Sequence, residues 1–322
     1  MQIFFRNKHF FAAAAISLIL LGCAPENNLS DIGAVQSQSI QRFDSFQSVT
    51  GNDQVLVAGT SAGVIVTSTD KGVSWKRQRL PAPASVIALS RCPDGTFAGL
   101  DFYHKVWIGD PSGQKWEARA LPSKNNFLTI ACDASNWIWM AGSHTTILSS
   151  ADKGGNWKTV DLGEDAILTT LQFIDDKNAV ITGEFGLFLT SVDGGASWQK
   201  QNKISNDFYP YAALFTDMQH GWVSGVAGVI MYTADGGKTW AAQVNRAATP
   251  VYALVKLGEE IYGLGGGQIV VQRNDEWVRF ESGISANWIA GTAVNSAVLL
   301  AAGSAGALQL INMANPATPV HR

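Results

Sequence analysis

The chain has 322 residues, of which 46% are hydrophobic and only 15% are charged, and it contains 32 glycines and 11 tryptophans. This composition predicts a large folded core and excludes disordered, collagen-like and coiled-coil proteins. The formal net charge is −3, and no stripe of basic residues offsets it, so nucleic acid is excluded as a partner.

The first 22 residues have the features of an export signal. Arg6 and Lys8 precede an apolar run from Phe10 to Leu21, which is shorter than the roughly 20 residues that a permanent membrane span needs. The sequence Leu-Leu-Gly-Cys at residues 20–23 resembles the lipobox of bacterial lipoproteins. Residues 1–22 are therefore predicted to be a lipoprotein signal peptide.

The resemblance to a lipobox implies that Cys23 is acylated and becomes the first residue of a protein anchored to a bacterial membrane through its lipid. Ala24, in place of an aspartate after the cysteine, favours the outer membrane, facing the periplasm. The alternative is an ordinary secretory signal that is cut elsewhere and leaves Cys23 unmodified. Residues 23–33 are expected to form a lipidated linker.

An internal repeat is the strongest feature of the sequence. The motif [S/T]-x-D-x-G-x-x-W occurs four times, and degenerate copies end at Trp116 and Trp277. The tryptophans that close the copies follow one another at intervals of about 40 residues. The motif residues are Ser68, Asp70, Gly72, Trp75, Ser150, Asp152, Gly154, Trp157, Ser191, Asp193, Gly195, Trp198, Thr233, Asp235, Gly237 and Trp240.

This period, with β-branched and aromatic runs between Gly and Asp turns, is typical of the four-stranded blades of a β-propeller. In the best copy, strands are predicted at 211–215, 222–225, 229–233 and 239–244, and the motif forms the turn between the last two. We expect the Asp to accept backbone N–H groups, the Gly to take a positive φ and the Trp to pack between blades. The motif is interpreted as structural.

The predicted fold class is all-β, with a single propeller domain over residues 34–312 and a C-terminal tail over 313–322. Six units carry a tryptophan, and residues 288–311 supply three more strands without the motif. Residues around 34–41 could then form the missing outer strand and close a ring of seven blades, which leaves no open edge. Six blades are the alternative.

Cys92 and Cys132 occupy nearly equivalent positions in adjacent repeats. A disulfide between them could persist in an oxidising envelope, whereas most cysteines so placed are small buried hydrophobes. The sequence leaves both possibilities open. No Cys and His cluster has zinc-site spacing, and neither a metal nor another cofactor is predicted.

These repeats resemble the Asp-box, also called the bacterial neuraminidase repeat (BNR). The fuller pattern, residues 215–225 followed by Gly228, Ile230 and Thr233, resembles the repeat of the photosystem II stability/assembly factor family, and residues 173–198 repeat it. The resemblance implies a seven-bladed, non-enzymatic lipoprotein that helps to assemble a membrane complex. Photosynthetic members are expected to carry an arginine cluster, whereas the arginines here are scattered, so a non-photosynthetic bacterial relative is predicted.

The predicted function is that of a monomeric assembly or scaffolding factor that binds a protein subunit of a membrane or envelope complex. In propellers, the face opposite the Asp-boxes usually binds the partner, and aromatic and arginine side chains are enriched at interface hot spots. The connection over residues 203–210 is the longest on that face and is expected to make contact. The candidate partner-binding residues are Tyr103, His144, Phe185, Phe208, Tyr209, Arg246 and Trp288.

A cell-surface protein that binds or hydrolyses carbohydrate is the alternative function. A sialidase would need three convergent arginines, which the scattered arginines do not supply. A glycosidase needs two opposed carboxylates, and Glu184 and Asp207 are the only acidic pair that the loops of the predicted binding face suggest. No catalytic residue is therefore predicted.

Overall fold

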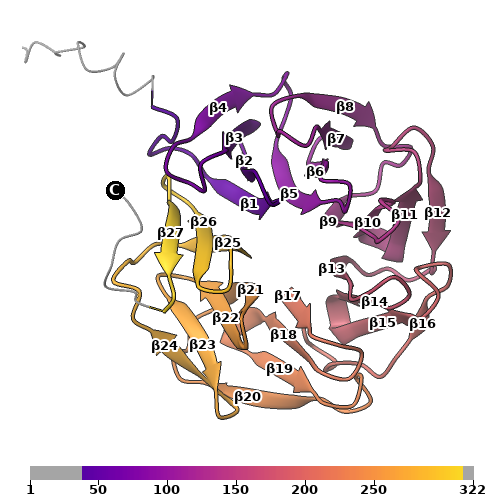
Figure 1. The fold of residues 1–322 in the computed structure, drawn as a ribbon. Coiled ribbons are helices and arrows are strands. Elements are labelled where there is room, and N and C mark those ends of the chain that lie inside the picture. Colours follow the sequence, from indigo (N-terminus) through magenta and orange to yellow (C-terminus); the bar gives the residue numbers. More distant parts are fainter. Residues whose placement is uncertain (1–37, 315–322) are drawn as a thin grey trace, which may run out of the picture. The chain divides into compact units, whose positions relative to one another are not determined.

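A computed structural model describes residues 38–314, which form antiparallel β-meanders arranged around a common centre (Figure 1). Helical structure in this part of the chain is limited to three short 3-10 turns. Between residues 38 and 314, no helix is long and apolar enough to cross a membrane. The predicted signal peptide, Cys23, the linker and residues 315–322 of the tail lie outside the described residues.

Neighbouring strands in each meander are also neighbours in the chain. The first meander consists of β1 (Phe46–Gly51), β2 (Leu56–Thr60), β3 (Val64–Ser68) and β4 (Lys76–Arg79), and the second of β5 (Val86–Arg91), β6 (Phe97–Asp101), β7 (Lys105–Gly109) and β8 (Trp116–Ala120). The third consists of β9 (Phe127–Cys132), β10 (Ile138–Gly142), β11 (Thr146–Ser150) and β12 (Lys158–Asp161), and the fourth of β13 (Leu168–Phe173), β14 (Ala179–Gly183), β15 (Leu187–Ser191) and β16 (Gln199–Lys200).

Two further four-stranded meanders and a three-stranded one follow. The fifth meander consists of β17 (Pro210–Phe215), β18 (Gly221–Gly225), β19 (Ile230–Thr233) and β20 (Ala241–Asn245), and the sixth of β21 (Val251–Leu257), β22 (Glu260–Gly265), β23 (Ile269–Arg273) and β24 (Glu276–Phe280). The three-stranded meander consists of β25 (Trp288–Ala293), β26 (Val298–Gly303) and β27 (Leu308–Asn312). The 3-10 turns η1 (Ser143–Thr145), η2 (Glu184–Gly186) and η3 (Val226–Gly228) join second to third strands.

The second and third strands of most meanders are buried on both sides, because each sheet lies between two neighbouring sheets. The strands β2 (LVAGT) and β10 (IWMAG) are buried at every position and show no alternation of polar and apolar residues. The fourth strands form the rim, where β4 (KRQR) has no buried position. Continuous apolar runs therefore mark the middle of a meander, and polar runs mark its outer strand.

Hydrophobic clusters join neighbouring meanders into a continuous core. Phe188 of β15 stacks on Phe215 of β17, with ring centres 5.4 Å apart, and meets Trp240 edge-on at 5.3 Å. Phe188 is only 1% exposed. Because aromatic rings bury a large area in preferred geometries, such contacts fix how one meander packs on the next.

The ring closes between β25–β27 and β1–β4 by side-chain packing. Phe46 of β1 and Leu300 of β26 lie in the same buried cluster. Residues 38–41 form no strand, so the prediction that residues 34–41 complete the last sheet is wrong for its described part. Residues 34–37 lie outside the part of the chain that the structure describes.

Residues 38–45 form a turn instead of the predicted strand, and Asp44 links this turn to the first and the last meander. Its carboxylate is 1% exposed and accepts hydrogen bonds from the Arg77 guanidinium at 2.7 and 3.0 Å and from the backbone N–H of Gln41 at 2.7 Å. Its carbonyl oxygen accepts the backbone N–H of Gly306, in the last meander, at 2.8 Å. A buried charge needs such partners, so this turn takes the place of a strand.

The outer strands β20 and β24 pair in parallel and join two meanders into one eight-stranded sheet. The side-chain oxygen of Gln243 accepts hydrogen bonds from the indole N–H groups of Trp222 and Trp277, at 3.2 and 2.8 Å. Arg246 completes the junction with a two-pronged salt bridge to Glu276, at 2.5 and 2.7 Å. These two meanders are therefore joined by backbone and side-chain bonds as well as by packing.

The antiparallel order places the turns on two opposite faces of the ring. Turns between the first and second strands and between the third and fourth strands lie on one face, which we call the box face because it carries the Asp-boxes. Turns between the second and third strands lie on the other face, together with the connections from one meander to the next. We call this the loop face; it includes residues 102–104, 143–145, 184–186 and 203–210.

Candidate functional site

Each of the four Asp-boxes closes on its own aspartate. In the third copy, Asp193 Oδ1 accepts hydrogen bonds from Ser191 Oγ at 2.8 Å and from the backbone N–H of Ser197 at 2.9 Å, and Asp193 Oδ2 accepts one from Ser197 Oγ at 2.6 Å. Ser191 Oγ in turn accepts the backbone N–H of Gly195 at 2.8 Å. Equivalent bonds form around Asp70, Asp152 and Asp235.

These bonds keep the box carboxylates ionised. In Asp193, the hydroxyl and backbone N–H of Ser197 and then the hydroxyl of Ser191 lower the pKa from 3.8 to about 2, and the other three copies behave alike. A general acid needs a raised pKa, so these groups are poorly suited to donate protons. They are also distributed over four separate turns, so they do not converge on one substrate.

The box glycine contacts the neighbouring meander. Gly237 has a φ of +82°, and a Cβ atom at this position would lie 2.2 Å from Cε1 of Phe188. Gly195 approaches Trp139, and Gly72 approaches Leu310, with corresponding distances of 2.6 Å. The box turn therefore packs on the preceding meander at a position where a side chain has no room.

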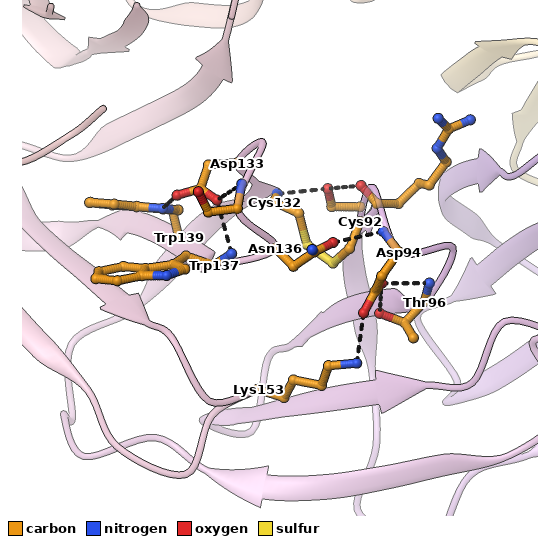
Figure 2. Close-up of a disulfide and its surroundings, with 12 residues drawn as sticks. Cys92, Asp94, Thr96, Cys132, Asp133, Asn136, Trp137, Trp139 and Lys153 are labelled. Carbon is orange, nitrogen blue, oxygen red and sulfur yellow. Dashed lines mark hydrogen bonds and ion pairs between the residues drawn. A yellow bond between two sulfur atoms is a disulfide. The ribbon is translucent and has the colours of Figure 1, made fainter. Parts of the chain in front are cut away.

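A disulfide joins Cys92 and Cys132 on the box face (Figure 2). Cys92 follows β5 and Cys132 ends β9, so the bond links the first strands of neighbouring meanders. Polar contacts connect the same two meanders: the backbone N–H of Asp94 donates to Asn136 Oδ1 at 2.7 Å, and Lys153 pairs with Asp94 at 2.8 Å. The structure thus resolves the choice between disulfide and free cysteines that the sequence left open.

The predicted partner-binding residues divide into exposed and buried ones. Phe185 and Tyr103 are 54% and 48% exposed, and His144 is also exposed on the loop face. Trp288 is 0% exposed, so the prediction that its side chain contacts a partner is wrong, and Phe208 is 5% exposed, so its ring is largely buried.

Both buried rings fill space in the core. Trp288 begins β25 and packs in the cluster between the last two meanders, whereas Phe208 lies against Gly225, where a Cβ atom would approach its Cζ to 2.6 Å. Residue type alone does not say which way an aromatic ring points. Arg246 is exposed, but its guanidinium is bound to Glu276, so it is not a free hot-spot arginine.

The connection over residues 203–210 is held against η2. The backbone N–H of Gly186 donates to the carbonyl of Phe208, and that of Ile204 donates to the carbonyl of Gly186, both at 2.9 Å. The carboxylate of Glu184 accepts the backbone N–H of Ile167 at 2.8 Å. The loop and the turn together form a cavity of about 220 Å³, lined by Glu184, Phe185, Asp207, Phe208 and Tyr209.

A second cavity, of about 270 Å³, adjoins the first at Tyr209, which lines both. Tyr209 also begins a row of rings with Tyr211 and Tyr252, whose ring centres are 5.9 and 5.3 Å apart. Burial, the negative charge of Glu184 and the neighbouring Tyr211 raise the pKa of Tyr209, so its hydroxyl stays protonated at neutral pH.

The sequence interpretation missed two members of this surface, Phe102 and Leu128, which are 60% and 39% exposed and line the second cavity. Phe102 begins a turn between second and third strands, and Leu128 lies near the start of a first strand. Apolar residues at such positions on the loop face are the signal that could have identified them. Between residues 38 and 314, no group of three or more His, Cys, Asp or Glu side chains could hold a metal ion.

Comparison with known proteins connects this architecture to a family. A family model described as "Photosynthesis system II assembly factor YCF48" matches residues 108–209 and 155–250. The photosystem II assembly lipoprotein Ycf48 of Synechococcus sp. (strain CC9902) is 29% identical over 177 residues, which cover 40% of this chain and 53% of the relative. Its counterpart in Trichormus variabilis (strain ATCC 29413 / PCC 7937) is 31% identical over 167 residues, 49% of each chain. The chain thus spans about half the length of these relatives.

Solved structures show the same fold. Virginiamycin B lyase from Staphylococcus aureus aligns with a TM-score of 0.72 at 14% identity, over 84% of this chain and 94% of the lyase. YCF48 from Cyanidioschyzon merolae aligns with a TM-score of 0.68 at 15% identity, over 83% of this chain and 95% of that one. A structure of YCF48 bound to D1 peptide aligns with a TM-score of 0.67 at 14% identity, over 84% and 94%.

The fold and the repeated motif define an all-β propeller of the BNR class, as the sequence predicted. The chain is similar to the Ycf48 assembly factors over its central repeats and shares their propeller fold, which confirms the predicted resemblance to photosystem II assembly factors. The named sequence relatives are assembly factors, and the lyase shares the fold at low identity.

Proposed function

We propose that this protein is a non-enzymatic assembly factor that binds a protein subunit of a membrane or envelope complex through its loop face. The observation that carries the proposal is the set of exposed aromatic side chains around two adjoining cavities on that face. The relatives are named as photosystem II assembly lipoproteins, and one YCF48 structure holds a D1 peptide, which supports a protein partner.

Lipid attachment at Cys23 is part of the same proposal. It is supported by the lipobox-like residues 20–23 and by relatives that are named lipoproteins. The mature protein would be a monomer held on the outer membrane, facing the periplasm. The scattered arginines favour an envelope complex other than a photosystem: Arg77, for example, is taken up by Asp44, and Arg246 by Glu276.

We also infer that the meanders count as seven blades, with the pairing of β20 and β24 as a contact between two of them. This count is supported by six consecutive four-stranded meanders and one three-stranded meander between residues 46 and 312. In this interpretation the Asp-boxes are structural turns, and Asp70, Asp152, Asp193 and Asp235 have no catalytic or metal-binding role.

Carbohydrate binding is the second candidate function, and the tyrosine row favours it. The ring of Tyr211 contacts those of Tyr209 and Tyr252. Flat aromatic surfaces of this kind can pack on sugar rings. Saturable binding to a glycan panel, lost when Tyr211 is changed to Ser, would support this function over the first. The assembly-factor proposal predicts no such binding.

The proposal is tested by recovering the tagged, lipidated protein from its native membrane after mild crosslinking, with mass spectrometry of the eluate. One stoichiometric membrane complex is expected, and it should be lost in Cys23→Ala. Phe185→Asn, on the loop face, should reduce the recovery, whereas Val192→Asn, a residue 60% exposed on the box face, should not. Repeated recovery of the protein alone would overturn the proposal.

A further inference from the structure

The two cavities on the loop face differ in chemistry. The lining of the larger one is mainly apolar and includes Ile87, Leu128 and Ile167 beside the polar residues Asp101, His104 and Asn126, whereas the smaller one is lined by two acidic residues, Glu184 and Asp207. Their volumes of about 270 and 220 Å³ lie below the roughly 300–1,000 Å³ of small-molecule sites. Each cavity is therefore sized for one side chain of a larger partner.

The carboxylates of the smaller cavity have no basic partner among the described residues. Two other acidic residues near this face are neutralised: Glu164 pairs with Lys200 at 2.8 Å, and Glu276 pairs with Arg246. In contrast, neither Glu184 nor Asp207 takes part in a salt bridge within the described chain. The cavity thus combines unneutralised negative charge with aromatic side chains, a setting that attracts a cation.

Phe185 supplies a second and independent observation. Its side chain is 54% exposed, and its backbone has a φ of +58°, in the left-handed region that bulky residues rarely occupy. The corresponding residue of η3 is Ala227, with nearly the same φ of +56°, so the turn itself does not require an aromatic ring. A largely exposed phenylalanine that lines a cavity, at a turn position where alanine suffices, offers an apolar surface to a partner.

We propose that the paired cavities bind an extended segment of the partner protein through two side chains. An apolar side chain lies over Ile87, Leu128 and Ile167, and a lysine or arginine side chain enters between Glu184 and Asp207. Side chains two residues apart in an extended chain point to the same side, so a short segment can supply both. This inference rests on the proposed function, because it names the chemistry of the protein partner that the loop face recognises.

The test is a selection of random 12-residue peptides displayed on phage, with the full lipidated protein in detergent as bait. Selected peptides should carry Lys or Arg close to an apolar residue. Synthetic versions should bind Asp207→Asn about tenfold more weakly, the expected loss of one charge-assisted hydrogen bond. The charge-reversed Asp207→Lys should select acidic peptides instead.

Asp165→Asn is the matched control, because Asp165 is an exposed acid of the preceding connection that lines neither cavity. It should leave peptide affinity unchanged. Asp207 forms no hydrogen bond within the described residues, so Asp207→Asn should melt at the wild-type temperature, and a loss of binding would not reflect unfolding.

Three outcomes would each overturn this inference. The selected peptides lack a cationic residue, Asp207→Asn leaves peptide affinity unchanged, or no peptide is selected at all. The membrane recovery experiment decides the proposed function separately. If Phe185→Asn loses a membrane complex that the wild type recovers, while no cationic peptide binds, only the chemistry assigned to the cavities fails.

Discussion

Gly237→Ala should destabilise the protein through two separate effects. The φ of +82° at Gly237 places an alanine in the left-handed region, at a cost of about 1–2 kcal/mol. The new Cβ atom would also lie 2.2 Å from Cε1 of Phe188, and overpacking of this kind costs about 1–3 kcal/mol. The free energy of unfolding should therefore fall by about 2–5 kcal/mol in total.

Phe188 has little freedom to relieve the clash, because it is 1% exposed and packed between Phe215 and Trp240. Gly163→Ala is the matched control. Gly163 has a φ of +74°, but no atom lies within 4 Å of the position that its Cβ would take. The control should show only the backbone cost, so the difference between the two variants measures the contact with the neighbouring meander.

The assay is urea unfolding followed by tryptophan fluorescence, with midpoints compared at unchanged slope. Shortening the neighbour in the double variant Gly237→Ala/Phe188→Leu should recover part of the loss caused by Gly237→Ala, because the two positions are in contact. If Gly237→Ala were no more destabilising than Gly163→Ala, the Asp-box would not lock one meander to the next, and the packing argument would be refuted.

Four further outcomes are expected. Replacing both Cys92 and Cys132 with Ala should lower the free energy of unfolding by about 2–4 kcal/mol, measured by urea midpoint, and reductant should have no further effect on that variant. Asp44→Asn should cost about 3 kcal/mol, because it leaves the largely buried Arg77 guanidinium without its charge partner; Asp44→Glu is the conservative control in the same thermal melts. The pKa of each box aspartate is lowered to about 2 in the folded protein. The ionised aspartates therefore stabilise the fold fully above their unfolded pKa near 4, and this stabilisation is lost as the pH falls toward 2. Melting temperatures measured between pH 5 and pH 2 should fall accordingly. Asp193→Ala should lower the melting temperature at pH 7 without selectively removing partner binding, and a loss of binding at unchanged stability would contradict the structural role of the box.

The local structure was predictable because its causes lie within one repeat. The strands predicted at 211–215, 222–225, 229–233 and 239–244 correspond to β17, β18, β19 and β20, with bounds that differ by at most two residues. Turn chemistry sets these bounds: the Asp and Gly of each box form their bonds within eight residues of sequence. A repeating motif therefore carries enough information to place strands and turns.

The errors concern contacts between distant segments. Whether the rings of Phe208 and Trp288 point inward depends on neighbouring sheets, which no local pattern reveals. Arg246 finds Glu276 at a separation of 30 residues, and the closing of the ring depends on Asp44 rather than on a strand. The sequence sufficed to place the loops of the candidate face on one side of the propeller, whereas the exposure of its individual side chains depended on the packing.

The closure through Asp44 has a consequence for the order in which the chain folds. The bond between the backbone N–H of Gly306 and the carbonyl of Asp44 joins segments near opposite ends of the domain. Contacts of such high sequence separation form late and slowly. No described strand pairs with the outer edge of β27. Until the closing contacts form, the apolar surface around Leu300 and Leu308 is uncovered as well. The incompletely closed ring is thus the state in which this protein is most exposed to aggregation and to proteolysis.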